Sequence, residues 1–360
     1  MQAPYSKIKL FSGLLHGKKA FVGPYWLTIC ISSFCNLSCI NCFYHSPSVR
    51  SKGNRPKQFI DPQPLFDLCQ SAATMGTQEV MISGAGEPLM HPKLDSILSA
   101  THIAGLKTTL FTNGTLINDK LIDLLFKYNT NRIRISLWAK SIQEYKKNYP
   151  GTDPGMFTQT LKNIELIQGR KQKEDRHLPI VQLHQPLNRH NIENLDQVES
   201  FIRSTGIDRV SFSPLKIIDD DLESYYLSET QKSGLIAELK KLAGRLEKTG
   251  IGHNIPETLT RYRVGKDVCN ALPCYIGFIH ACISEDLSVM PCQGAKTPIG
   301  HLRKETFTEI WNSKILAEFR QQTKTCAGMK KIIVKNRCNY CCHTYHNYKI
   351  NRLMKFFPAR

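Results

Sequence analysis

Three closely spaced cysteines are the first residues of this chain whose type and spacing could do chemistry. They stand in the segment Cys35-Asn36-Leu37-Ser38-Cys39-Ile40-Asn41-Cys42, a C-x3-C-x2-C pattern after which no fourth Cys follows nearby. Three thiolates on one loop can each bind a different iron of a cubane cluster, which leaves one iron open to another ligand. The alternatives are a zinc knuckle completed by His45 or cysteines that only pack in the core. The spacing favours the cluster.

The other cysteines gather near the C-terminus. The sequence has 13 Cys, and none of them lies between residues 70 and 268. The N-terminus Met1-Gln2-Ala3-Pro4 lacks the charged and apolar pattern of a secretion signal, so the thiols are expected to stay reduced. This uneven distribution predicts two metal-binding regions that flank a body without cysteines.

Alternating strand and helix patterns fill that body and must position these residues. Apolar runs predict strands, and helical periodicity predicts a helix after each of them. The strands are expected at 25–32, 78–83, 107–113, 132–138, 179–185 and 208–213, and the helices at about 63–75, 93–104, 118–128, 156–168, 192–204 and 229–249. Asn118 is a predicted helix cap, and 169–177 is predicted to be a solvated loop. Six β-α units favour an α/β fold with a parallel sheet, either doubly wound or a partial (β/α)6 barrel with a small Cys-rich C-terminal extension.

In both folds ligands lie at the carboxyl ends of the strands, so the loops after the strands hold the remaining candidates. The segment Ser83-Gly84-Ala85-Gly86-Glu87-Pro88 offers two glycines, where bare backbone can approach a ligand, beside a carboxylate. Arg134, Ser136 and Trp138 share one face of the fourth strand, an unusual lining for pure packing.

Taken together, these loops resemble the radical S-adenosylmethionine (radical SAM) superfamily over about residues 26–216. Cys35, Cys39 and Cys42 match the cluster motif of that family. Gly84, Ala85, Gly86 and Glu87 are similar to its glycine-rich motif, which holds the methionyl amino group of S-adenosylmethionine (AdoMet). Ala85 stands where the family usually has Gly, and Asn41 where it often has an aromatic residue. The resemblance also implies that Ser136 faces the ribose or carboxylate of AdoMet.

The C-terminal cysteines resemble the twitch or SPASM extension of many radical SAM enzymes. Cys274, Cys292, Cys338 and Cys341 fit the pattern that holds one auxiliary [4Fe-4S] cluster, and a second cluster stays open because four further cysteines remain there. A zinc site of Cys338, Cys341 and His343 is the alternative. Leu287 stands where the family commonly has Gly. The resemblance divides the chain into a basic segment at 1–24, a radical SAM partial barrel at 25–255, a twitch/SPASM-like domain at 256–344 and a basic amphipathic tail at 345–360.

The resemblance implies an enzyme of oxidoreductase type that receives an electron from a donor such as flavodoxin or ferredoxin. It would cleave AdoMet reductively to a 5′-deoxyadenosyl radical, which abstracts a hydrogen from the substrate. An auxiliary cluster implies a net two-electron oxidation. The expected substrate is a small, carrier-linked or lipid-linked metabolite, because about 25 residues before the first strand are too few for a leader-binding domain. Maturation of a ribosomally made peptide is the alternative.

The net charge of +18 lies at the two ends of the chain. Residues 1–60 hold eight Lys or Arg and no acidic residue, whereas 61–295 is nearly neutral. Both ends mix cations with Leu, Ile and Phe, which suits either the surface of an anionic membrane or solvated tails. The sequence therefore predicts a cytoplasmic protein, with peripheral contact at the inner face of the membrane as an option. A non-catalytic zinc protein that binds nucleic acid is a further alternative, but the neutral body argues against a nucleic-acid partner.

Overall fold

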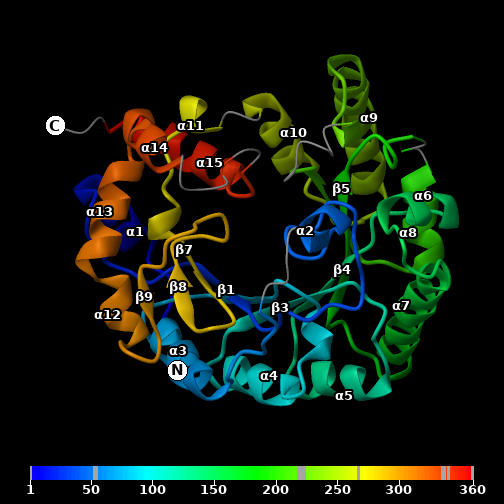
Figure 1. Ribbon diagram of the computed structural model, residues 1–360, viewed down its shortest axis with the longest axis horizontal. Coiled ribbons are helices and arrows are strands. Elements are labelled where there is room, and N and C mark those ends of the chain that lie inside the picture. Colours follow the sequence, from blue (N-terminus) through cyan, green and yellow to red (C-terminus); the bar gives the residue numbers. More distant parts are fainter. Residues whose placement is uncertain are drawn as a thin grey trace.

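A curved sheet of nine strands forms the framework of the computed structural model, which describes residues 2–51, 56–193, 195, 197–216, 224–265, 268–333, 338 and 341–357. Its strand order is β6-β5-β4-β3-β2-β1-β7-β8-β9 (Figure 1). The first six strands are parallel and follow the chain in order: β1 Trp26–Cys30, β2 Glu79–Ser83, β3 Lys107–Thr112, β4 Arg132–Ser136, β5 Ile180–Leu187 and β6 Arg209–Pro214. The prediction of an open, partial α/β barrel is confirmed.

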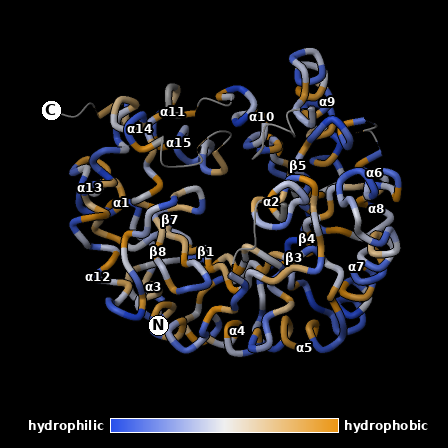
Figure 2. Tube along the Cα trace, viewed as in Figure 1, coloured by the Kyte–Doolittle hydropathy of each residue, from blue (hydrophilic) through white to orange (hydrophobic). Residues whose placement is uncertain are grey.

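Helices cover the convex face of this sheet. The main ones are α3 Gln63–Thr74, α4 Leu94–Ile103, α5 Asp119–Lys127, α7 Gly155–Lys173, α8 Gln197–Thr205 and α9 Glu229–Lys248. The side chain of Asn118 caps α5 by accepting a hydrogen bond from the Leu121 N–H, as predicted. Strand residues that face these helices, such as Ile29, Ile82 and Ile133, have no exposed surface. Hydrophilic residues lie along the outer side of the helices (Figure 2), so burial of the apolar strand face stabilises this half of the molecule.

The C-terminal part continues the same sheet. Strand β7, His280–Ile283, pairs in parallel with β1, while β8 (Ser288–Met290) and β9 (Gly300–His301) are antiparallel. Strand β8 ends two residues before Cys292. In the β7–β8 turn Leu287 has a φ of +71°, a conformation that favours Gly. Its side chain is fully buried, and this burial offsets the backbone strain.

One sequence prediction is wrong: the segment 169–177 is not a solvated loop throughout, because α7 continues to Lys173. Arg170 reaches across to Asp119 and Asp123 of α5 and back to Glu174, each at 2.7 or 2.8 Å. The buried Lys171 pairs with Asp208 at 2.8 Å. Three of these partners, Asp119, Asp123 and Asp208, lie outside the segment itself, so its composition alone could not reveal them.

Asp208 is expected to support this part of the fold. Its carboxylate accepts from the Lys171 ammonium and, at 2.7 Å, from the Val181 N–H at the start of β5. Asp208→Ala would leave a buried cation and a strand amide without a partner, at a cost of about 2 kcal/mol in unfolding free energy. Urea unfolding measures this change. The exposed Asp95→Ala variant is the control, and equal stability of the two variants would contradict the assignment.

The remaining helices lie around the mouth and the open edge of the sheet. They are α1 Lys7–His16, α2 Pro47–Ser51, α6 Ile142–Asn148, α10 Ile255–Val264, α11 Val268–Ala271, α12 Phe307–Trp311, α13 Lys314–Thr323, α14 Cys326–Ile333 and α15 Thr344–Met354. Helix α1 contacts the segment that follows α15, because the rings of Phe11 and Phe357 are 4.9 Å apart. A search of the described residues finds no helix with the length and hydrophobicity of a membrane span.

Candidate active site

The loop after β1 brings the three N-terminal cysteines together. Burial raises the pKa of Cys39, and so do the neighbouring Cys42 and Cys35 thiols, which places all three within electrostatic reach. Backbone N–H groups point at the sulfurs: Leu37 N lies 3.5 Å from Cys35 Sγ, and His45 N lies 3.3 Å from Cys42 Sγ. Such N–H···S contacts stabilise thiolates, so this donor set fits an iron-sulfur cluster.

No group of three Cys, His, Asp or Glu side chains in the described ranges is arranged to hold a single metal ion. The zinc alternatives at His45 and His343 therefore have no converging ligand set in the described structure.

The glycine-rich segment after β2 lies directly against this cysteine loop. Gly86 N donates to Ser32 O at 2.8 Å, and Glu87 N donates to Phe34 O at 2.6 Å. A Cβ atom at Gly84 would lie 2.6 Å from Ser32 O, and one at Gly86 would overlap the Phe34 carbonyl. The sequence suggested that these glycines let backbone approach a ligand. In the structure they let two loops approach each other.

Glu87 is a buried acceptor at the carboxyl end of the sheet. Its carboxylate accepts hydrogen bonds from Thr112 Oγ1 and Asn113 N, both at 2.7 Å, and from Leu89 N at 3.0 Å. Burial outweighs these bonds and raises the pKa of Glu87 to about 6. Ser136 lies on the concave face, where its hydroxyl accepts from Trp138 Nε1 at 2.9 Å.

Sequence reasoning missed Glu285, which lies just after β7. Its Oε1 accepts from Ala85 N at 3.0 Å, and the residue is buried. The sequence feature that could have revealed Glu285 is its position just after a strand. That strand, β7, is the seventh parallel strand of the sheet. Its contact with Ala85 links the C-terminal part to the glycine-rich segment.

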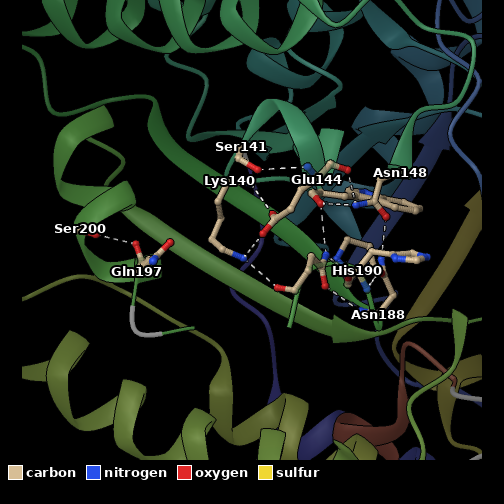
Figure 3. Close-up of polar contacts among 11 residues, drawn as sticks. Lys140, Ser141, Glu144, Asn148, Asn188, His190, Gln197 and Ser200 are labelled. Carbon is tan, nitrogen blue, oxygen red and sulfur yellow. Dashed lines mark hydrogen bonds and ion pairs between the residues drawn. The ribbon is translucent and has the colours of Figure 1, made fainter. Parts of the chain in front are cut away.

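A polar network behind β4 and β5 fixes the same cysteine loop (Figure 3). Asn188 Nδ2 donates to Asn148 Oδ1 at 3.0 Å, and Asn148 O accepts from Ile40 N at 2.9 Å. Nearby, Lys140 pairs with Glu144 at 2.9 Å. Asn188 is buried, and its hydrogen bond to Asn148 joins the segments that follow β4 and β5.

Asn41 occupies the position before the third cysteine, where the radical SAM motif often has an aromatic residue. Its amide donates to Lys216 O at 2.7 Å. Because Lys216 follows β6, this bond joins the cysteine loop to the far side of the barrel mouth.

The C-terminal cysteines form a second group. Burial, followed by neighbouring thiols, raises the pKa values of Cys274 and Cys292 to about 12, and Cys338 is among the neighbours of both. The same two thiols raise the pKa of Cys341, whose largest influence is a hydrogen bond with Cys342. The structure thus gathers all four predicted positions, and it adds Cys342.

Among the remaining C-terminal cysteines, Cys282 lies on β7, within electrostatic reach of Cys292. Cys282 of β7 has its sulfur 4.0 Å from that of Cys30 of β1, and the two thiols are free. The side chain of Cys269 lies outside the described residues. Between the two cysteine groups, Trp26 stacks near His280, His343 and His346, with ring centroids 4.8 to 5.9 Å apart.

Comparison with known families agrees with this arrangement. Residues 29–197 match the model of the Radical SAM superfamily, and residues 274–347 match SPASM, an iron-sulfur cluster-binding domain. The chain belongs to the radical SAM superfamily and is an enzyme. More narrowly, it is a radical SAM enzyme with a C-terminal SPASM domain, whose cofactors are a [4Fe-4S] cluster, AdoMet and auxiliary iron-sulfur clusters. This identification replaces the alternative of a non-catalytic zinc protein.

Similar proteins share this architecture and differ in substrate. The chain is 24% identical over 343 residues to the AdoMet-dependent heme synthase of Methanosarcina barkeri, covering 86% of each chain. It is 23% identical to the cysteine-type anaerobic sulfatase-maturating enzyme of Clostridium novyi, covering 80% of this chain and 79% of that one. The crystal structure of Streptococcus suis SuiB has a similar fold, with a TM-score of 0.66, 17% identity and coverage of 93% of this chain and 76% of the other.

Proposed function

We propose that this enzyme oxidises its substrate by two electrons on the concave face of the sheet, between the two cysteine groups. The observation that carries the proposal is that the sheet continues from β1, which leads into the Cys35 loop, to β7 of the C-terminal part, and that Cys342 lies within electrostatic reach of Arg134 on β4. Cys35, Cys39 and Cys42 would hold the cluster that, with bound AdoMet, supplies reductive cleavage and a 5′-deoxyadenosyl radical. Cys274, Cys292, Cys338 and Cys341 would hold an auxiliary cluster that accepts the second electron.

The residues of the chain itself are proposed to bind AdoMet, to orient it and to shield it from water. Glu87, beside Ala85 and Gly86, is proposed to accept a hydrogen bond from the methionyl ammonium of AdoMet, and Ser136 to contact its ribose or carboxylate. The buried bonds of Glu87 to Thr112 and Asn113 fix the carboxylate, so little conformational entropy is lost on binding. A flavodoxin or ferredoxin is the proposed electron donor.

Two classes of substrate are compatible with this proposal: a small or carrier-linked metabolite, and a peptide. A small or carrier-linked metabolite is consistent with the similarity to the heme synthase. A peptide is supported equally by the similarity to the sulfatase-maturating enzyme and to SuiB, which also has a structure bound to its precursor peptide SuiA. The identities are too low for either relative to transfer its substrate.

Electron paramagnetic resonance of the anaerobically reconstituted protein tests the two-cluster arrangement. After reduction, two distinguishable cluster signals are expected, and AdoMet should change only the one that Cys35→Ala removes. Cys338→Ala should remove the other signal. A preparation with full iron content and a single signal would contradict the proposal.

The affinity for AdoMet is expected to depend on pH through Glu87. Its pKa in the folded protein is about 6, above the ordinary 4.5, so the carboxylate takes up a proton as the pH falls through 6. Protonation removes the attraction for the ammonium group, and affinity should fall by up to about tenfold per pH unit below 6. Equilibrium binding of AdoMet to the reconstituted protein measures this.

Glu87→Gln should bind AdoMet weakly at pH 8 and show a flat profile. Glu79→Gln, at the other end of β2, is the matched control and should keep the wild-type profile. A wild-type profile in Glu87→Gln would contradict the role of this carboxylate.

The two ends of the chain support a proposed location at an anionic membrane. Apolar side chains near the Phe11–Phe357 contact are exposed, with Ile8 at 81% and Phe356 at 79%. Exposed cations surround them (Lys7, Lys9, Lys18, Lys19, Arg352 and Lys355). Residues 1–60 and 319–360 contain no acidic residue. Apolar insertion and attraction of about 1 kcal/mol per cation suit an anionic lipid surface.

Flotation with vesicles tests this location. The protein should float with phosphatidylglycerol-containing vesicles and remain behind with phosphatidylcholine vesicles, because the attraction depends on lipid charge. Phe356→Ser with Ile8→Ser should lose most of the binding. Ile103→Ser, an exposed apolar residue on α4, should have no effect. Equal binding by all variants, or no flotation, would contradict the proposed location.

A further inference from the structure

The concave face of β4 carries an arginine, Arg134, that forms no ion pair with a carboxylate of the described residues. Alternate residues of β4 are partly exposed on this face, while Ile133 and Ile135 are fully buried under the helices. The Nη2 atom of Arg134 lies 2.7 Å from Nδ1 of His184, and its Cζ lies 4.9 Å from the ring of Phe111. Its Nε–H is buried and lacks a hydrogen-bond partner among the described residues. The hydrogen-bond donors of Arg134 are thus only partly paired within the described residues.

The surroundings of Arg134 are positive. Burial and the nearby charges of Arg132 and Arg261 lower its pKa to about 10, which is still high enough to keep it charged at neutral pH. Glu257 and Cys342 are the groups whose negative charge acts on it, and no ion pair within the described part of the chain joins Arg134 to Glu257. A partly buried cation without a counter-ion is costly, because its desolvation is not repaid by pairing.

His184 adds a directed donor to the same place. Burial, with Arg134 and Arg261 nearby, holds the pKa of His184 well below its ordinary value, so the ring is neutral. Because its Nδ1 accepts from Arg134, its proton is on Nε2, which lies 3.5 Å from the hydroxyl of Ser213. The strand register places Ser136, His184 and Ser211 side by side on β4, β5 and β6. A row of donors therefore lines the concave face next to the guanidinium.

A structural arginine in this protein has different surroundings. Arg320 of α13 is fully buried and donates to the carbonyls of Gly277, Trp311 and Lys18 at 2.8 to 3.3 Å. Three carbonyl acceptors share its hydrogen bonds. Arg134 instead contacts one imidazole nitrogen, which accepts a hydrogen bond, and one aromatic ring. This arrangement is expected where a bound ligand supplies the remaining acceptor.

We propose that Arg134, with His184 and Ser213, binds an anionic group of the substrate, either a carboxylate or a phosphate. The substrate of this enzyme is then an acidic molecule, held by its charge on the concave face below Ser136. The proposal rests on the proposed function, since it takes the concave face to be the reaction site. It deepens that function by naming the substrate's chemical class, which metabolites and peptides can both meet.

Calorimetric titration of the reconstituted, AdoMet-loaded enzyme with inorganic phosphate and with succinate tests the site. Wild type should bind at least one of these anions, and Arg134→Gln should bind it at least about tenfold more weakly, as expected for loss of a charge-assisted hydrogen bond. Arg134→Lys should retain part of the affinity. Arg203→Gln, on the exposed face of α8, should match wild type. Iron content and circular dichroism verify that each variant is folded.

Three results would overturn the proposal: no anion binding by wild type, equal binding by Arg134→Gln, or a parallel loss of AdoMet affinity. The last result would mean that Arg134 holds the carboxylate of AdoMet and not the substrate. Reductive cleavage of AdoMet, measured in the same preparations without any anion, reports on the proposed function separately. Failure of the anion site with intact cleavage would leave the radical chemistry standing.

Discussion

Replacing Cys35, Cys39 and Cys42 by Ala is expected to remove about four iron atoms per chain and to abolish cleavage of AdoMet. The three thiols lie within electrostatic reach of one another, and backbone N–H groups point at two of the sulfurs. Iron and sulfide analysis after anaerobic reconstitution measures the loss, and 5′-deoxyadenosine measures the activity.

Cys69→Ala is the matched control for this variant. Cys69 is fully buried in α3, and burial raises its pKa to about 12, so it is an apolar packing residue. Its replacement should lower stability slightly and leave iron content and cleavage intact. The iron of the C-terminal cysteines should survive in the triple variant. Loss of all iron in that variant, or full iron in it, would contradict the separation of two cysteine groups.

Gly86→Ala has the second largest expected effect. The added methyl group would overlap the carbonyl of Phe34. Neighbouring strands hold the backbone of Phe34 and of Gly86 in place. We expect a loss of about 3 kcal/mol in unfolding free energy, since neither loop can yield without breaking the bonds of Gly86 N and Glu87 N. The displaced loop should also fail to assemble the cluster of Cys35, Cys39 and Cys42.

The control is Gly169→Ala, which lies within α7 and has open space around the added methyl group. It should be neutral or stabilise the protein by roughly 0.5 kcal/mol, because Ala favours the helix. Denaturant unfolding and iron analysis are measured on both variants. A Gly86→Ala protein with wild-type stability and iron content would show that the two loops are not in fixed contact.

Much of the barrel could be predicted from the sequence because its signals are local. Buried strands such as Val80–Ile82 are short apolar runs, and the cap at Asn118 depends on residues only three positions away. The extension of α7 could not be predicted, because its charges are paired with Asp119, Asp123 and Asp208, far away in sequence. Strand β7 was missed as part of the barrel for the same reason, since its partner β1 lies some 250 residues earlier.

In the candidate site, too, local features could be predicted from the sequence, whereas long-range contacts could not. The cysteine spacing identified which residues belong together, because ligands of one loop are close in sequence. The bond from Ala85 to Glu285 and the position of Cys342 near Cys292 depend on long-range packing. The neighbourhood of Arg134 and His184 likewise depends on strand register, which places alternate residues of β4 and β5 side by side.

The most direct test of the central claim is the formation of 5′-deoxyadenosine by the anaerobically reconstituted protein with AdoMet and dithionite. The proposed arrangement predicts 5′-deoxyadenosine and methionine in equal amounts from wild type, and neither from the variant that lacks Cys35, Cys39 and Cys42. A wild-type preparation with its full content of iron and sulfide that forms no 5′-deoxyadenosine would contradict the account.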